Sequence, residues 1–274
     1  MSFSIVVLTL NEERNLPRCL RSIRFSDDIV VLDSGSTDRT EAIARDAGAR
    51  FIVRPFDNFA AQRNFAQTAI HFKYPWVFHL DADEEFTPLL ANEARAGSVR
   101  TDLDGFYVAP RMMFFGKWVP HCTDFPAWQA RFVRAPQFSF IEVGHGQREA
   151  PHMRLEKLTS SYLHDLTSGG VDEWLEKHRR YAKAEAVAYV TSSQAYRIAD
   201  LFAQDKLRRR RALKYLSYKL PFRPIFRFIY QYFLRLGILD GIAGLRYCIL
   251  LGRYEGYASK EIKKLREKTR STCA

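Results

Sequence analysis

The sequence predicts an α/β fold with a mainly parallel central sheet, followed by a helical C-terminal region. Two observations support this prediction. The first 85 residues alternate between short β-branched runs and segments whose apolar residues have helical spacing, and helical spacing returns after residue 170. With 274 residues, of which 47% are hydrophobic and 27% charged, the chain has a globular composition and room for one large domain or two unequal pieces.

Strands and helices are expected to alternate strictly over the first 85 residues. The expected strands cover residues 3–8, 28–32, 49–54 and 76–80, and the expected helices cover residues 16–23, 37–47 and 59–71. Such alternation produces right-handed βαβ units and a mainly parallel sheet. Sheets of this kind bind ligands beyond the carboxyl ends of their strands, so the candidate site is expected there.

Polar and acidic residues follow three of these strands. They are Thr9, Asn11 and Glu12 after the first strand, Asp33 to Asp38 after the second, and Asp81 to Glu85 after the fourth, with Gln62, Arg63 and Asn64 near the start of the third helix. We expect these segments to converge on one crevice. Carboxylates gathered in this way repel one another unless a hard cation lies among them.

The strongest local signal is Asp81-Ala82-Asp83, directly after a hydrophobic strand. Two carboxylates at this spacing can hold one divalent ion, and Mg²⁺ typically completes its shell with phosphate oxygens. A tripeptide of this kind is frequent by chance, so its position gives it weight. Arg63 could neutralise a diphosphate. For Asp33, an Asx-turn or a helix cap is the alternative to ligand contact.

Four ordered motifs resemble the nucleotide-sugar domain of glycosyltransferase family 2, most closely its bacterial lipopolysaccharide-core β-1,4-glucosyltransferase-like branch. They are VVLTLNEERNLPRCLRSI, DDIVVLDSGSTDRT, AAQRNFA and WVFHLDADEEFTP. The resemblance is strong over residues 1–90 and weaker over 226–244. It implies a GT-A fold and an inverting transfer, with a catalytic domain over residues 1–165 (donor half 1–90, acceptor half 91–165) and a helical region over 166–274.

The resemblance also implies roles for individual residues. Thr9 and Glu12 would border the uridine, Asp33 would contact the base or ribose, Arg63 would face the diphosphate, Asp81 would lie near the ribose, and Asp83 would bind Mg²⁺ or Mn²⁺. Family members often carry a second Asp in the motif of the second strand, where this chain has Ser34. That position therefore provides one carboxylate fewer.

Inversion needs a general base that deprotonates the acceptor hydroxyl. The branch often shows a Val-His-Glu-like sequence, whereas this chain has VGHGQRE over residues 143–149. Glu149 is the first candidate for the base and Asp124 the second, with His145 as a positioning residue. The alternative for His145 is an exposed side chain in a turn between glycines. Arg131 is expected to line the acceptor site.

The excess of basic over acidic residues is confined to the second half of the chain. Residues 1–150 hold 17 Lys and Arg against 19 Asp and Glu, whereas residues 151–274 hold 25 against 12. Over residues 222–236 an apolar stripe shares a predicted helix with Arg223, Arg227, Gln231 and Arg235. A helix of this kind lies in a membrane interface, and the cluster from Lys206 to Lys214 suits anionic lipids. The alternative is a helix that packs on the catalytic domain.

These inferences predict an inverting, metal-dependent glycosyltransferase that moves a hexose from a UDP-sugar to a lipid-linked or lipopolysaccharide-type glycan acceptor. We expect Mg²⁺ or Mn²⁺ as cofactor and an anionic membrane surface as partner. No signal peptide, transmembrane helix or disulfide framework is apparent in the sequence, so we expect a cytoplasmic protein on the inner face of the cytoplasmic membrane.

Two other functions would suit parts of the sequence. A basic nucleic-acid-binding protein would account for a pI of about 9.6, but it leaves the acidic crevice unexplained, so no nucleic acid is expected as partner. A non-catalytic sugar-nucleotide-binding membrane partner would not need intact Asp81 and Asp83. A nucleotidyltransferase is disfavoured because no Gly-rich phosphate loop opens near the N-terminus.

Overall fold

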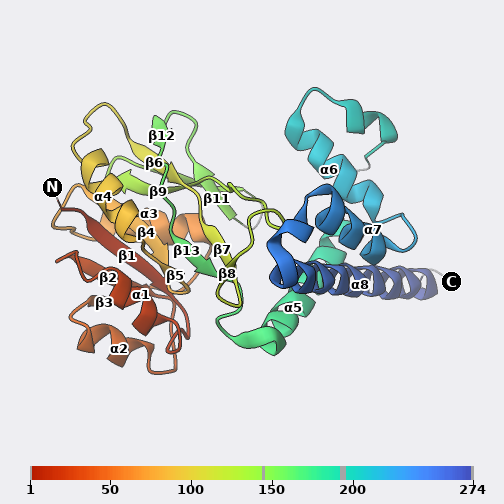
Figure 1. Ribbon diagram of the computed structural model, residues 1–274, viewed down its shortest axis with the longest axis horizontal. Coiled ribbons are helices and arrows are strands. Elements are labelled where there is room, and N and C mark those ends of the chain that lie inside the picture. Colours follow the sequence, from red (N-terminus) through yellow and green to blue (C-terminus); the bar gives the residue numbers. More distant parts are fainter. Residues whose placement is uncertain (1, 144–145, 192–195, 273–274) are drawn as a thin grey trace. The chain divides into compact units, whose positions relative to one another are not determined.

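The computed structural model describes residues 2–143, 146–191 and 196–272, which divide into two compact units (Figure 1). The first unit comprises the chain up to Trp118 together with Asp124–Ser168. The second comprises Val119–Thr123 and the chain from Gly169 onward. The short segment 119–123 therefore belongs to the helical unit, although the residues on either side of it belong to the α/β unit.

The first unit is built on a seven-stranded sheet with the order β12-β6-β9-β4-β1-β2-β3. Its strands are β1 (Ser4–Thr9), β2 (Ile29–Asp33), β3 (Arg50–Val53), β4 (Trp76–Asp81), β6 (Gly105–Val108), β9 (Gln129–Arg134) and β12 (Leu155–Lys157). The four strands β3, β2, β1 and β4 are mutually parallel, and β9 is antiparallel to both β4 and β6. The predicted α/β class with a mainly parallel central sheet is confirmed.

The carboxyl ends of β1, β2 and β4 lie side by side at the edge of the sheet where ligands are expected. The register pairs Thr9 with Asp33 and Leu8 with Asp81, so the polar residues that end β2 and β4 flank the end of β1. Ile5 and Val7 face one apolar cluster and Val6 faces another, so β1 is buried on both faces. This burial explains the continuous apolar run in its sequence.

Helices cover both faces of the sheet. They are α1 (Leu16–Ser22), α2 (Thr40–Asp46), α3 (Phe59–Ala69) and α4 (Pro88–Gly97). Residues of α1, α2 and α4 join the cluster of Ile5, whereas Ala66 of α3 joins the cluster of Val6. Asn58 caps α3 by accepting a hydrogen bond from the Ala61 amide at 2.7 Å, which fixes the start of the helix that carries Arg63.

A second, four-stranded sheet lies in the region where the sequence showed no clear pattern. Its order is β5-β13-β7-β8, with β5 (Glu84–Glu85), β13 (Leu163–Asp165), β7 (Arg111–Phe114) and β8 (Lys117–Trp118). The antiparallel pairing of β13 with β5 places His164 opposite Glu84. A separate hairpin joins β10 (Phe140–Val143) to β11 (Gly146–Glu149).

The second unit is helical, as the sequence predicted. It contains α5 (Gly170–Thr191), a 3₁₀ turn η1 (Ile198–Phe202), α6 (Lys206–Ser217), α7 (Arg223–Ile229), a π-helical turn η2 (Tyr230–Leu234), a 3₁₀ turn η3 (Gly237–Asp240) and α8 (Gly241–Thr272). Both α5 and α7 pack on α8. The helix predicted over residues 222–236 therefore changes from α to π winding at Tyr230. Within the described residues, no helix combines the length and apolar character needed to cross a bilayer.

Candidate functional site

A cavity of about 630 Å³ in the first unit brings together polar side chains from distant segments of the chain. The charged and titratable residues in its lining include Arg63, Asp81, Glu84, Arg131, Glu149 and His164. Four of these, Arg63, Asp81, Arg131 and Glu149, were given a role from the sequence. The structure thus places the predicted diphosphate-facing arginine, a carboxylate of the Asp-Ala-Asp motif and the first candidate base around one cavity.

Asp81 lies between two buried arginines. Arg63 Nη2 donates to Asp81 Oδ1 at 2.8 Å, and Arg131 Nη2 donates to Oδ2 at 3.0 Å. Burial alone would raise the pKa of Asp81, but the charges of Arg131 and Arg63 outweigh it and hold that pKa well below its usual range. The carboxylate is therefore ionised at any physiological pH, and it fixes the position of both guanidinium groups.

Arg63 has hydrogen-bonding capacity that the described part of the protein does not use. Its side chain is 1% exposed, and its Nε and Nη1 have no hydrogen-bond partner among the described residues. Buried N–H groups of a guanidinium are costly to leave unpaired and match the oxygens of a phosphate group. Arg63 is thus suited to an anionic ligand in the cavity.

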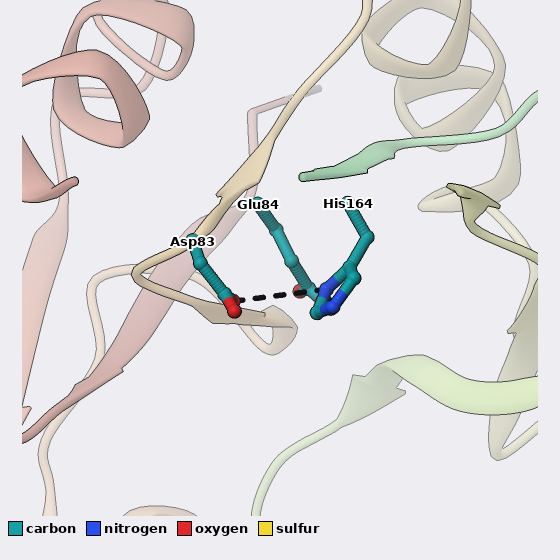
Figure 2. A group of neighbouring side chains, drawn as sticks. All are labelled: Asp83, Glu84 and His164. Atoms are coloured by element: carbon teal, nitrogen blue, oxygen red, sulfur yellow. Dashed lines mark ion pairs between the residues drawn. The ribbon is translucent and has the colours of Figure 1, made fainter. Parts of the chain in front are cut away.

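Asp83, Glu84 and His164 form a group that could hold a metal ion (Figure 2). One ligand atom from each residue lies within 4.8 Å of the other two. His164 Nδ1 is 3.4 Å from Glu84 Oε1 and 3.7 Å from Asp83 Oδ1. Two carboxylates and one imidazole fit a divalent cation such as Mn²⁺ or Mg²⁺.

The charges of this group depend strongly on one another. Burial lowers the pKa of His164, but its hydrogen bond to Glu84 and the charge of Asp83 outweigh burial and raise that pKa to about 9. Burial raises the pKa of Glu84, whose Oε1 also accepts from Arg131 Nη2 at 2.9 Å. In the metal-free protein a protonated imidazole thus supplies the positive charge that the two carboxylates require.

The structure separates the two aspartates that the sequence analysis treated as one metal-binding pair. Asp83 lies in the group with Glu84 and His164, whereas both oxygens of Asp81 are engaged by arginines. The i, i+2 spacing turns the two side chains toward different partners because the chain leaves β4 between them. Asp83 is the better candidate ligand, and direct ligation by Asp81 stays a prediction.

Asp33 organises the loop after β2. Thr9 Oγ1 donates to Asp33 Oδ1 at 2.8 Å, and Asp33 Oδ2 accepts from the amides of Gly35 and Ser36 at 2.8 and 2.7 Å. This is the Asx-turn that was the alternative for Asp33, and Gly35 within it has a φ of +102°, a conformation that residues with a Cβ rarely adopt. Glu12 Oε2 accepts from Asn15 Nδ2 at 2.7 Å. Contact of Thr9, Glu12 or Asp33 with a nucleotide stays a prediction.

The candidate bases are in different surroundings. Glu149, at the end of β11, lines the cavity, and its Oε1 accepts a hydrogen bond of 2.6 Å from Tyr107 Oη. Burial and this contact raise the pKa of Tyr107 to about 12, so the phenol stays a donor. Asp124 is exposed and lies outside the lining of the cavity. His145 lies outside the described residues.

Three residues of the site make contacts that were not predicted from the sequence. His164 lies on a three-residue strand far along the chain from the carboxylates that it meets, so no local spacing pointed to it. Glu84 stood unassigned in the acidic run after the fourth strand. Arg131, expected at the acceptor site, lines the cavity and also bridges Asp81 and Glu84, a contact that the sequence did not predict. The signal in the sequence that could have pointed to these partners was the acidic run itself, because a cluster of carboxylates requires cationic partners from elsewhere in the chain.

Comparison with known proteins finds similarity in the N-terminal part of the chain. The family model described as "Glycosyl transferase family 2" matches residues 4–121. The lipopolysaccharide core biosynthesis glycosyltransferase LpsC of Rhizobium meliloti is 36% identical over 124 residues, which cover 42% of this chain and 44% of LpsC. An uncharacterized glycosyltransferase of Rickettsia bellii is 36% identical over 91 residues, which cover 33% of this chain and 30% of that protein. The chain thus spans less than half the length of these relatives.

Among solved structures, similarity is partial. Glucosyl-3-phosphoglycerate synthase from Mycobacterium tuberculosis, in complex with Mg²⁺ and uridine diphosphate, matches with a TM-score of 0.37 and 20% identity over 50% of this chain and 57% of that chain. The same synthase with Mn²⁺ and UDP-glucose gives a TM-score of 0.34 and 25% identity over 40% and 43% of the two chains.

Proposed function

We propose that this chain, whose residues 4–121 match the model of glycosyltransferase family 2, is a member of that family and transfers a hexose from a UDP-sugar to a glycan acceptor with the help of a divalent cation. The observation that carries the proposal is a cavity whose lining includes two buried arginines together with Glu84 and His164 of the candidate metal group. A nucleoside diphosphate carries the negative charge that both features would bind. The resemblance of residues 1–90 supports uridine as the base, a GT-A fold and inversion as the stereochemical course.

Each part of the site would act on one part of the reaction. Asp83, Glu84 and His164 would hold Mn²⁺ or Mg²⁺, which when bound supplies positive charge for the departing diphosphate. Arg63 would bind the same diphosphate through N–H groups that are fixed before the substrate arrives. Preorganised donors of this kind stabilise charge that grows as the glycosidic bond to the nucleotide breaks.

Glu149 would act as the general base. Its carboxylate would accept the proton of the acceptor hydroxyl while that oxygen attacks the anomeric carbon from the face opposite the leaving diphosphate. The hydrogen bond from Tyr107 would hold the carboxylate in place. The name of LpsC supports a lipid-linked or lipopolysaccharide-type glycan as the acceptor, and we place the reaction on the cytoplasmic face of the membrane.

Calorimetric titration of the protein with a panel of UDP-sugars, in Mn²⁺ or in EDTA, tests the proposal. We expect one UDP-sugar to bind in Mn²⁺ and to lose most of its affinity in EDTA and in the variant Asp83→Asn. Glu41→Gln removes a carboxylate from an exposed ion pair on α2 and serves as the matched control, which should bind like the wild type. If the folded protein with Mn²⁺ binds no nucleotide sugar, the proposal is wrong.

A further inference from the structure

The segment from Leu220 to Ile242 presents apolar side chains to solvent, whereas its charged residues are buried or half-buried. Its exposed large hydrophobic residues are Leu220, Phe222, Ile225, Phe226, Ile229, Tyr230, Phe233, Leu234, Leu236, Ile238, Leu239 and Ile242. Phe222 and Leu234 are each 72% exposed. No charged residue of this segment, all of which lies within the described residues, is in the exposed class. A helix on the surface of a soluble domain has the opposite arrangement.

The polar side chains of the same segment hold it to the rest of the helical unit. The Arg223 guanidinium is 2.7 Å from Glu255 Oε2 of α8. Gln231 Nε2 donates to the Cys122 carbonyl at 2.6 Å, and Arg235 Nη2 donates to the Thr123 carbonyl at 2.7 Å. These contacts turn the polar face inward, so the apolar face must point away from α8.

Packing between elements makes the exposed residues one surface. The turn η2 continues α7, η3 packs on η2, and both α7 and η3 pack on α8 (Figure 1). Gly237 permits the close approach of η3 to η2, because a Cβ at this position would lie 2.8 Å from the Gln231 carbonyl oxygen and 2.9 Å from Cys122 Cβ. We call the exposed side chains of residues 220–242 the apolar ridge.

Exposed basic residues lie on both sides of the ridge along the chain. Lys219 precedes it and Arg246 follows it, and α6 adds the exposed run Arg208 to Arg211 upstream. Residues 206–270 hold 18 Lys and Arg against 4 Asp and Glu. An apolar surface bordered by cations matches an anionic bilayer, whose headgroups are negative and whose interior is hydrocarbon. An apolar interface between copies of the chain would instead bring these like charges together.

We propose that the apolar ridge inserts into the interface of a membrane that contains anionic phospholipid, with the flanking basic residues on the headgroups. The ridge would enter one leaflet without crossing it. This inference rests on the helical unit alone and does not require the proposed transferase activity. The two therefore fail separately, because vesicle binding and UDP-sugar binding are measured independently.

Flotation of the full-length protein with phosphatidylcholine vesicles, with and without phosphatidylglycerol, tests the inference. We expect the protein to float with vesicles that contain phosphatidylglycerol. The double variant Phe222→Asp and Leu234→Asp should reduce the vesicle-bound to free ratio by at least about tenfold, since each change removes a large apolar side chain from the inserted surface. Ile242→Asp, at a position that is 69% exposed, should reduce it independently.

Leu89→Asp is the matched control, because Leu89 is 70% exposed but lies on α4 of the α/β unit. It should bind vesicles like the wild type. Retained UDP-sugar binding and an unchanged circular dichroism spectrum would show that the ridge variants are folded. Equal vesicle binding by the wild type and the ridge variants would overturn the inference. So would a stable dimer in light scattering that these variants convert to monomers, because the ridge would then be a contact between two copies.

Discussion

At the scale of single residues, Glu149 and Asp124 are the two carboxylates between which the sequence left the role of base open. Glu149→Gln keeps the shape of the side chain but cannot accept a proton. We expect this variant to lose about 10²–10⁴-fold in kcat while it keeps its affinity for the UDP-sugar. Asp124→Asn should stay within a few-fold of the wild type, because Asp124 lies outside the lining of the cavity. Steady-state kinetics and donor titration check both variants, and the reverse pattern would assign the base to Asp124.

His164 makes metal binding depend on pH. In the metal-free protein its pKa is raised to about 9, so the imidazole is protonated at pH 7, and an ion can bind the nitrogen only by displacing that proton. The affinity for Mn²⁺ should therefore rise by up to about tenfold per pH unit between pH 7 and 9 and level off above pH 9. Calorimetry in buffers of different ionisation enthalpy should detect about one proton released per ion at pH 7.

The variant His164→Gln shows how much of the proton release on Mn²⁺ binding comes from the imidazole. It should bind Mn²⁺ at least about tenfold more weakly, since changes to a metal's supporting residues alone typically cost 10–100-fold. Its binding should also release less than half of the protons that the wild type releases. If proton release is unchanged in His164→Gln, the imidazole is not a ligand.

The residues that the sequence identified share a local signal, and His164, which it missed, has none. Asp83 and Arg63 follow or accompany a recognisable strand or helix, so their position relative to the sheet could be predicted. His164 becomes a neighbour of Glu84 only through the pairing of two very short strands. Strands of two or three residues have no measurable periodicity, so this contact required the structure.

At the scale of elements, the two halves of the α/β unit differ in how well their strands could be predicted from the sequence. Strands β1 to β4 alternate with helices, and β1, β2 and β4 are buried, so their apolar runs revealed them. Strands β5 to β13 are mostly antiparallel or very short and lie among prolines and aromatic residues. The helix expected over residues 222–236 has its predicted polar and apolar faces, but the apolar face is the more exposed one, and Arg223 and Gln231 of the polar face are buried. Amphipathic spacing alone does not tell which face is covered.

The pair Arg223–Glu255 is the element-scale contact that holds α7 on α8. Its side chains are 8% and 9% exposed, so removal of one partner leaves a buried charge. We expect Arg223→Met to lower the free energy of unfolding by about 3–5 kcal/mol. The double variant Arg223→Met with Glu255→Leu should recover most of this loss, because a buried ion pair replaced by apolar side chains is often neutral.

Urea denaturation followed by circular dichroism measures these differences. Lys264→Met is the matched control on α8, because its ion pair with Glu261 is largely solvent-exposed and should contribute less than about 1 kcal/mol. An equal loss in Arg223→Met and Lys264→Met would show that the buried pair does not stabilise the helical unit.

At the scale of the whole molecule, charge and chemistry are divided between the two units. The candidate metal group and the cavity belong to the α/β unit, whereas the excess of Lys and Arg belongs to the second half of the chain. This division accounts for a basic protein with an acidic site. A protein whose function was nucleic-acid binding would have no need of the exposed apolar ridge.

The dependence of binding on salt concentration distinguishes membrane insertion from nucleic-acid binding as the function of the basic half. The Debye screening length falls from about 10 Å at 0.1 M to about 3 Å at 1 M ionic strength. The attraction of the basic residues for anionic headgroups should therefore weaken strongly over this range. Burial of the apolar ridge does not depend on screening, so we expect part of the vesicle binding of the wild type to persist at 1 M NaCl. The variant Phe222→Asp with Leu234→Asp should lose this residual binding. A protein held by charge alone would leave the vesicles completely at 1 M NaCl, and its affinity for a labelled oligonucleotide would fall along the same salt curve.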